Sequence, residues 1–302
     1  MTTTLEFTRQ EAAKTAWGKT SAAAGLAVLL WASSFVAIRG IGHALSPAPL
    51  ALFRLGVAAV TLTVFVGVKR GLRVRLSRKA FLLIAAYAVL WLAGYTVALN
   101  AAERHVDAGT AALLVNLAPL LVAVTAGKFL GEGVSRWLII GSVVALAGAT
   151  LIATGASAQR EWGGVLLCLL AAVLYAAGVM IQKVALRHAD GLTVIWLGSV
   201  VATVVLLPWL PQLLGELSTA PAGAMLSAAY LGVFPTAIGF VAWAYALRRS
   251  DASRLSAVTY AVPAVSVLLS WLLLAEIPAA LGLLGGALCL LGVAISRRRQ
   301  SA

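Results

Sequence analysis

The side chains best suited to recognising a small ligand lie in the middle of long apolar segments. Trp and Tyr offer flat, rigid, mostly apolar surfaces with one hydrogen-bonding tip each. Asn116 can donate and accept hydrogen bonds, so it would fix a polar group of the ligand. Such residues suit a small molecule that combines an apolar or aromatic part with a polar group, although aromatic side chains can also serve only to pack helices together. We predict that the binding site is formed by Trp31, Ser34, Trp91, Tyr95, Asn116, Tyr175, Thr236, Trp243 and Tyr260.

A second set of residues is expected to shape or gate this site. Prolines in mid-segment lack a backbone N–H and leave carbonyl groups without helical donors, which a substrate ammonium could use. Carboxylates at segment ends are expected to cap helices or to form ion pairs. The set comprises Arg54, Pro119, Pro235, Pro263, Glu132 and Glu276.

Arg54 is the only ionisable residue well inside an apolar segment. Charges within a membrane are costly and therefore suggest function. Arg54 nevertheless lies only about two helical turns from the end of its segment at Pro47, so its side chain can reach toward the interface. Two roles stay open: a structural ion pair with Glu103 or Glu276, or a contact with a substrate carboxylate.

The remaining reactive residue types argue against catalysis and against metal or cofactor binding. The three histidines lie near predicted loops, and Cys168 and Cys289 lie inside apolar segments without metal-ligand spacing. No Asp or Glu lies in mid-segment, where proton-coupled transporters usually keep a titratable group. We therefore expect no enzyme and no cofactor, and we favour facilitated transport or exchange over proton antiport.

The composition indicates that most of the surface of this protein faces lipid. Hydrophobic residues make up 62% of its 302 residues and charged residues 11%, whereas soluble domains are usually about 45–50% apolar and about 25% charged. The net charge of +13 comes from Lys and Arg in the short breaks between apolar segments. It therefore predicts membrane orientation, and no nucleic-acid partner is expected.

Ten apolar segments without period-two alternation predict an all-α integral membrane protein of ten transmembrane helices. If the N-terminus is cytoplasmic, 19 of the 23 Lys and Arg residues fall on the inner side and three on the outer side. This bias predicts that both termini face the cytoplasm. The segments are Ser21–Ile38, Pro47–Val68, Ala80–Ala101, Ala108–Leu130, Arg136–Thr154, Gly163–Val184, Leu192–Leu210, Ala222–Ala246, Ser253–Leu274 and Ala279–Ser296.

The chain also repeats itself at a constant spacing of 144 residues, which relates Trp31 to Tyr175 and Pro119 to Pro263, among other pairs. Each half holds five segments, an odd number, so the second half must enter the membrane from the opposite side. Inverted repeats of this kind are typical of alternating-access transporters, whose sites lie at the midplane. We divide the chain into a cytoplasmic segment 1–20, repeats 21–155 and 156–296, and a basic cytoplasmic tail 297–302.

These features resemble the drug/metabolite transporter superfamily and its EamA family. The motifs are LLWASSFVAIRG in the first segment and PLALFRLGVAAV in the second, together with NLAPLLVAVTAGKFLGE and YAVPAVSVLLSWLLLAE in the fourth and ninth. The resemblance implies export of small metabolites, and the chain is most similar to bacterial aromatic amino-acid exporters. It also implies that the first, third, fourth, sixth, eighth and ninth helices line a central cavity, with the fifth and tenth outside.

The predicted function is thus the export of small metabolites, in particular amino acids with aromatic or apolar side chains, across the inner (plasma) membrane. Proton-coupled drug or metabolite efflux and flipping of a lipid-linked substrate stay open as alternatives. A channel is disfavoured because no charged ring or carbonyl filter motif is present. The glycines of the fifth and tenth helices could mediate a homodimer or pack within one chain, so a monomer and a dimer are both possible.

Overall fold

The structure is a computed structural model that describes residues 2–41, 44–105, 111, 114–133, 135–154, 162–274 and 280–296. All regular elements in these ranges are helical. Five helical stretches of the described chain are long and apolar enough to cross a membrane on their own: Pro47–Lys69, Arg78–Ala102, Trp162–Ala185, Gly191–Leu217 and Ala222–Arg249. The described part of the chain is therefore all-helical, as predicted, and its long apolar stretches suit a membrane protein. The count of ten spans stays a prediction.

The helices follow the predicted apolar segments closely, because each segment can satisfy its backbone polar groups only within itself. In the first half they are α1 (Thr2–Ile41), α2 (Pro47–Arg70), the consecutive α3 (Arg78–Tyr87), η1 (Ala88–Tyr95) and α4 (Thr96–Ala102), then α6 (Ala118–Phe129) and α7 (Arg136–Thr154).

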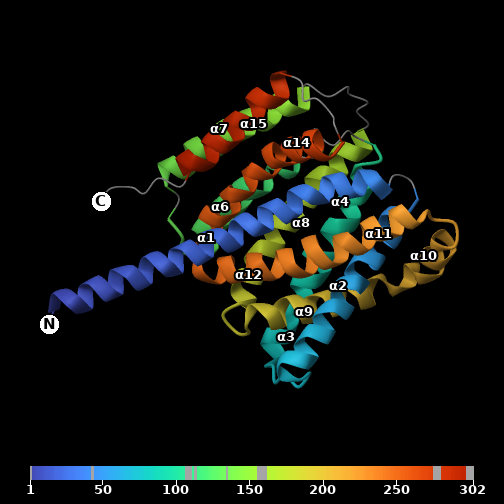
Figure 1. Cartoon of the computed structure of the whole chain (residues 1–302), viewed down its shortest axis with the longest axis horizontal. Coiled ribbons are helices and arrows are strands. Elements are labelled where there is room, and N and C mark those ends of the chain that lie inside the picture. Colours follow the sequence, from blue (N-terminus) through green and yellow to red (C-terminus); the bar gives the residue numbers. More distant parts are fainter. Residues whose placement is uncertain are drawn as a thin grey trace.

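The second half repeats this order. It contains α8 (Trp162–Ala185), α9 (Gly191–Leu206) with η2 (Leu207–Trp209) and α10 (Leu210–Leu217), α11 (Ala222–Leu231) with η3 (Gly232–Ile238) and α12 (Gly239–Arg249), α13 (Ala252–Ala257) with η4 (Val258–Tyr260) and α14 (Ala261–Leu274), and α15 (Ala280–Ser296). Helix α1 begins and α15 ends at the same end of the bundle (Figure 1).

Local signals set several helix ends. Ser77 and Asp190 precede α3 and α9, and their side chains accept hydrogen bonds from backbone N–H groups of the first turn. Gly71 and Gly131 follow α2 and the fourth apolar segment with φ angles of 77° and 69°. Glycine adopts this left-handed conformation without a steric penalty, so the chain can leave the helix there.

Helices α7 and α15 pack side by side at the edge of the bundle (Figure 1). Their approach is so close that a Cβ atom added to Gly148 would lie 2.5 Å from the Gly285 carbonyl oxygen, and one added to Gly292 would lie 2.5 Å from the Gly141 carbonyl oxygen. At the crossing, the Cys289 thiol donates to the Ala145 carbonyl at 3.4 Å. Gly141, Gly148, Gly285 and Gly292 thus meet within one chain, while the expectation of a monomer or a homodimer stays a prediction.

These contacts reveal a pseudo-twofold relation between the repeats. Ala145 and Cys289 are separated by 144 residues, and so are Gly141 and Gly285, and Gly148 and Gly292. Gly148 therefore meets Gly285, the repeat partner of Gly141, and Gly141 meets Gly292, the repeat partner of Gly148. The sequence repeat is thus also a spatial repeat.

The helices are irregular at equivalent depths in both halves. The π-helices η1 and η3 begin at Ala88 and Gly232, again 144 residues apart. A turn at Asn116–Leu117 interrupts the fourth segment, and the 3-10 turn η4 interrupts the ninth at the equivalent position. Irregular backbone at membrane depth is tolerated where protein or a cavity surrounds it, and π-segments are frequent at functional sites.

Replacing Gly148 by Ala should destabilise the protein. The added Cβ would lie within 3 Å of Gly285, Leu288 and Cys289, and two of the three contacted atoms are backbone atoms. Overpacking of this kind costs about 1–3 kcal/mol. Thermal unfolding of the protein in detergent would measure the loss.

The matched control is Gly25→Ala in α1, where nothing lies within 4 Å of the new Cβ. It should be neutral or stabilising, because Ala exceeds Gly in helix propensity by up to about 1 kcal/mol. Equal unfolding temperatures for the two variants would contradict the tight α7–α15 crossing.

Candidate functional site

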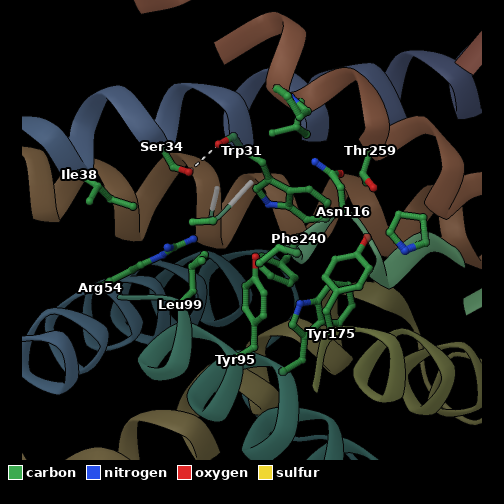
Figure 2. A pocket seen from close by; sticks show the side chains of 16 residues that line it. Trp31, Ser34, Ile38, Arg54, Tyr95, Leu99, Asn116, Tyr175, Phe240 and Thr259 are labelled. Carbon is green, nitrogen blue, oxygen red and sulfur yellow. Dashed lines mark hydrogen bonds between the residues drawn. The ribbon is translucent and has the colours of Figure 1, made fainter. Parts of the chain in front are cut away.

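A cavity of about 100 Å³ lies between the two repeats. Its wall combines apolar and aromatic surface with a few polar groups, as is typical of small-molecule sites. The lining residues are Trp31, Ser34, Ile38, Arg54, Trp91, Tyr95, Leu99, Ala111, Val115, Asn116, Pro119, Tyr175, Phe240, Thr259, Val262 and Pro263. They come from α1, α2, η1, α4, the fourth segment, α8, α12 and the ninth segment, and Figure 2 shows how most of them converge.

Aromatic rings form one side of the cavity. The Trp91 ring meets the rings of Tyr175 at 4.9 Å and Phe240 at 5.2 Å between centroids, both edge to face. The Trp31 ring lies 5.2 Å from Phe240, and the Tyr95 ring lies 6.0 Å from Tyr175. Such tilted pairs are each worth about 0.5–1.5 kcal/mol beyond their buried area, so the rings support one another as a rigid surface.

The two repeats meet at this surface through equivalent contacts. The Trp31 indole N–H donates to the Pro235 carbonyl oxygen at 3.2 Å, which joins α1 to η3. The partners of these residues at the 144-residue spacing are Tyr175 and Trp91, and their rings are in contact. Gly178 on α8 allows this approach, because the Trp91 Cβ lies where a side chain at Gly178 would begin.

Arg54 enters the cavity wall from α2 (Figure 2). Its Nε–H donates to the Thr236 hydroxyl oxygen at 2.5 Å, and that hydroxyl donates to the Leu231 carbonyl at 2.7 Å. Pro235 lacks the N–H that would bond to Leu231 in an α-helix. The Thr236 hydroxyl therefore links the Arg54 guanidinium to the backbone of the π-helix.

The structure places six of the nine predicted binding residues on the cavity wall, namely Trp31, Ser34, Trp91, Tyr95, Asn116 and Tyr175. Three lie elsewhere. Thr236 holds Arg54 from behind the wall. Trp243 is fully buried behind the Trp31 ring, at 5.0 Å between centroids. Tyr260 is also buried, and its hydroxyl lies toward Ser142 of α7.

The residues predicted to shape the site are more dispersed. Pro119 and Pro263 line the cavity, and Pro235 contributes its carbonyl to Trp31. Arg54 also lies within electrostatic range of Glu103, one of its predicted partners. The other predicted partner, Glu276, lies outside the described residues.

Glu132 caps a helix of the opposite repeat. Its carboxylate accepts hydrogen bonds from the backbone N–H groups of Ala252 and Ser253, at 2.8 and 2.9 Å, and from the Ser253 hydroxyl. These residues begin α13, so the carboxylate supplies the acceptors that the first turn lacks. In the structure, Glu132 thus joins the end of the fourth segment to the start of α13.

Phe240 and Thr259 were not predicted as wall residues from the sequence, and α2 was not among the helices expected to line the cavity, although Arg54 on α2 was expected to gate the site or to contact a substrate carboxylate. Phe240 lies three residues before Trp243, on the adjoining face of α12, and only the rotation of that helix decides which ring faces the cavity. The 144-residue spacing relates Thr259 to Val115, and the structure places both on the wall, but the sequence singled out neither of them.

Comparison with known proteins gives a consistent result. The profile of the family described as "EamA-like transporter family" matches residues 19–154 and again residues 162–298. The chain is 39% identical over 275 residues to the "Probable terminal-alkyne amino-acid exporter" of Streptantibioticus cattleyicolor, which covers 91% of this chain and 92% of the relative.

Two further similarities extend the comparison. The uncharacterized transporter YdfC of Bacillus subtilis is 35% identical over 271 residues, with 89% of this chain and 87% of the relative covered. A solved crystal structure superimposes with a TM-score of 0.76 over 93% of this chain and 97% of that chain, at 20% sequence identity. The last similarity shows a shared fold.

Thr236→Val should lower stability, because it removes the hydroxyl that serves both Arg54 and the Leu231 carbonyl while keeping the side-chain shape. Hydrogen bonds to charged groups contribute about 1.5–3 kcal/mol, and unpaired buried groups add to the loss. Thermal unfolding in detergent would show it. Thr236→Ser keeps the hydroxyl and should stay close to the parent protein; an equal loss in both variants would contradict the bridging role.

Proposed function

We propose, on the premise that this chain belongs to the EamA-like transporter family, that it exports amino acids with apolar or aromatic side chains. It is a membrane transporter, and its relatives are named as transporters and exporters. The observation that carries the substrate proposal is the cavity, in which an aromatic surface faces Arg54, the one cation among the lining residues that the structure describes.

The two sides of the cavity match the two ends of an amino acid. Trp31, Trp91 and Phe240 would pack against the apolar side chain, since their rings contribute rigid area at a low cost in conformational entropy. The relative with 39% identity is named for an amino acid with a terminal alkyne, which is apolar and unsaturated. An alkyne and a benzene ring both suit contacts with aromatic rings, so we propose that both kinds of side chain are accepted.

Arg54 would bind the substrate carboxylate. Its Nε is held by Thr236, so the guanidinium is oriented before the substrate arrives. In Figure 2 it points into the space between Ser34 and Leu99. Two N–H donors of an oriented guanidinium match a carboxylate in bidentate geometry. The substrate ammonium would then lie toward the polar groups of Asn116 and Thr259 on the opposite wall.

We further propose an orientation with both termini in the cytoplasm, in the inner (plasma) membrane. The excess of Lys and Arg in the loops of that side supports it. The wall residues Ile38, Arg54 and Leu99 lie near the end of α1, the start of α2 and the end of α4. In this orientation those helix ends face outward, so the cavity represents the outward-facing half of an alternating-access cycle.

Counterflow in reconstituted proteoliposomes tests the function. Vesicles are loaded with one unlabelled amino acid at a time, and the labelled form is added outside without a pH gradient. We expect accumulation with phenylalanine, tryptophan, leucine and propargylglycine, and much less with their methyl esters, which lack the carboxylate that Arg54 would bind.

The controls separate the alternatives. Equal accumulation of the esters would overturn the role of the Arg54–carboxylate contact while keeping the transport function. Accumulation only under an imposed pH gradient would favour proton-coupled efflux. With folded protein in the vesicles, failure of every amino acid under both conditions would overturn amino-acid export and favour a drug or lipid-linked substrate.

The aromatic surface is tested by combining Trp31→Ala with Tyr175→Ala. Both rings line the cavity, and each aromatic contact is worth about 0.5–1.5 kcal/mol. We expect the apparent substrate affinity in counterflow to fall by roughly tenfold or more, which corresponds to about 1.4 kcal/mol.

Trp162→Ala is the matched control, because Trp162 is 82% exposed and lies at the start of α8. It should transport normally. Unchanged affinity in the folded double variant would mean that the cavity rings only pack helices.

A further inference from the structure

The connection between α2 and α3 carries the largest group of cations in the chain. Six of the residues 69–79 are basic, namely Lys69, Arg70, Arg73, Arg75, Arg78 and Lys79. The sequence offers no counter-charge nearby, because no Asp or Glu occurs between Glu11 and Glu103. The orientation rule accounts for the side of the membrane on which these cations lie, but the other inner connections satisfy that rule with two or three cations each.

The fold of this connection does not require the cations. The connection 144 residues later, at 213–223, joins the equivalent helices of the second repeat. It contains no Lys or Arg and one Glu. The same topology is therefore built with and without basic residues, so the reason for the cations lies in what this face of the protein meets.

The backbone of the connection is held against the helix bundle. Val74 and Leu76 are half-buried and pack on the main core. Arg73 and Arg75 alternate with them along the chain and are exposed. The hydroxyl of Ser77 accepts a hydrogen bond from the first turn of α3, which fixes the end of the connection. The cations are thus presented by an anchored segment of chain.

The cations of this connection have no acidic partners within the protein. The exposed side chains are those of Lys69, Arg73, Arg75, Arg78 and Lys79. Within the part of the chain that the structure describes, none of these five has a carboxylate at ion-pair distance. The Lys69 ammonium lies 5.3 Å from the centroid of the Phe65 ring. Like charges gathered in this way repel one another, so bound anions would stabilise the connection.

Exposed apolar side chains adjoin the cations. Phe65 and Val68 in the last turns of α2 are 49% and 87% exposed, and Phe81 and Leu82 in the first turns of α3 are 48% and 56% exposed. In Figure 1 the connection lies at the bottom of the view, at the edge of the bundle opposite α7 and α15. None of its residues lines the cavity. Cations directly beside an apolar surface match the two parts of a phospholipid, its headgroup and its acyl chains.

We propose that the connection 69–79 binds an anionic phospholipid of the inner leaflet. The guanidinium groups of Arg73 and Arg75 would bind the phosphate oxygens, because a planar guanidinium matches two of them. The acyl chains would lie along Phe65 and Phe81. Basic segments next to a membrane are attracted to anionic lipids, which supports this partner. The inference rests on the proposed orientation and does not depend on the amino-acid substrate.

The bound lipid would stabilise elements that reach the cavity. Arg54 lies on α2 and Trp91 on η1, which continues α3, and both residues line the cavity. A ligand that binds only the folded protein raises its stability. We therefore expect the anionic lipid to raise the unfolding temperature.

A lipid-retention experiment tests the proposal. The protein in detergent is incubated with equal amounts of phosphatidylglycerol and phosphatidylcholine, and the lipid that stays bound after repurification is measured. We expect phosphatidylglycerol to be preferred by about fivefold or more, and its addition to raise the unfolding temperature by about 2 °C or more. Raising the salt concentration to about 0.5 M should reduce the preference, because salt screens exposed charges.

The combined variant Arg73→Gln and Arg75→Gln should lose at least about half of this preference. The matched control combines Arg187→Gln with Arg248→Gln, which removes the same charge from exposed positions of other inner connections. The control should keep the parent preference. Without added lipid, unfolding temperatures equal to that of the parent would show that both proteins are folded.

Three results would overturn the lipid site. They are equal retention of the two lipids by the parent, an equal loss in the variant and the control, and displacement of phosphatidylglycerol by glycerol 3-phosphate. The second result would attribute the attraction to net charge, and the third would indicate a site for soluble phosphates.

Counterflow by the same proteins separates this proposal from the proposed function. Normal counterflow in a parent protein without lipid preference would overturn the lipid site and retain amino-acid export. A clear preference for phosphatidylglycerol without counterflow of any amino acid would retain the lipid site and overturn the substrate.

Discussion

The bond from the Trp31 indole to the Pro235 carbonyl is the contact on which the middle of this protein depends. In a bilayer, irregular backbone persists only where the protein itself satisfies the freed groups. Pro235 and the π-helices η1 and η3 create such irregularity in both repeats. Side chains from the opposite repeat then cover it: Trp31 bonds to η3, and Tyr175 packs on Trp91 of η1. The aromatic cavity wall is therefore also part of the interface between the two repeats.

The same distorted helix explains how a cation is kept at membrane depth. The guanidinium of Arg54 would be costly without a partner, and it donates to the Thr236 hydroxyl, which in turn donates to the Leu231 carbonyl of the distorted helix. Arg54 thereby acquires a fixed orientation on the cavity wall. A structural role and a substrate-binding role, which the sequence leaves as alternatives, are compatible in this geometry.

The inverted repeat gives the two halves the same residue positions but different surroundings. The first-repeat positions Ile38 and Leu99 lie on an open wall, whereas the equivalent Gln182 and Trp243 are buried. Helices α7 and α15 stay outside this asymmetry, because their backbones meet at glycines and leave little room for rearrangement. These two helices form a tightly packed pair at the edge of the bundle, whereas equivalent residues of the two repeats differ in exposure at its centre.

The sequence by itself determined that the chain is suited to lipid, where most of its helices run, and that its two halves repeat at a spacing of 144 residues. Apolar length alone predicted α7 at Arg136–Thr154, and the bounds of α2, α8 and α15 differ by at most two residues from those predicted. It also predicted most of the cavity residues, because a residue in the middle of a spanning segment lies near the middle of the membrane, where the cavity is expected. Only the tertiary structure decided which face of each helix lines the cavity. Positions three residues apart, such as Phe240 and Trp243, differ by about 60° around the axis. On helices that are apolar on every side, packing rather than composition selects between them.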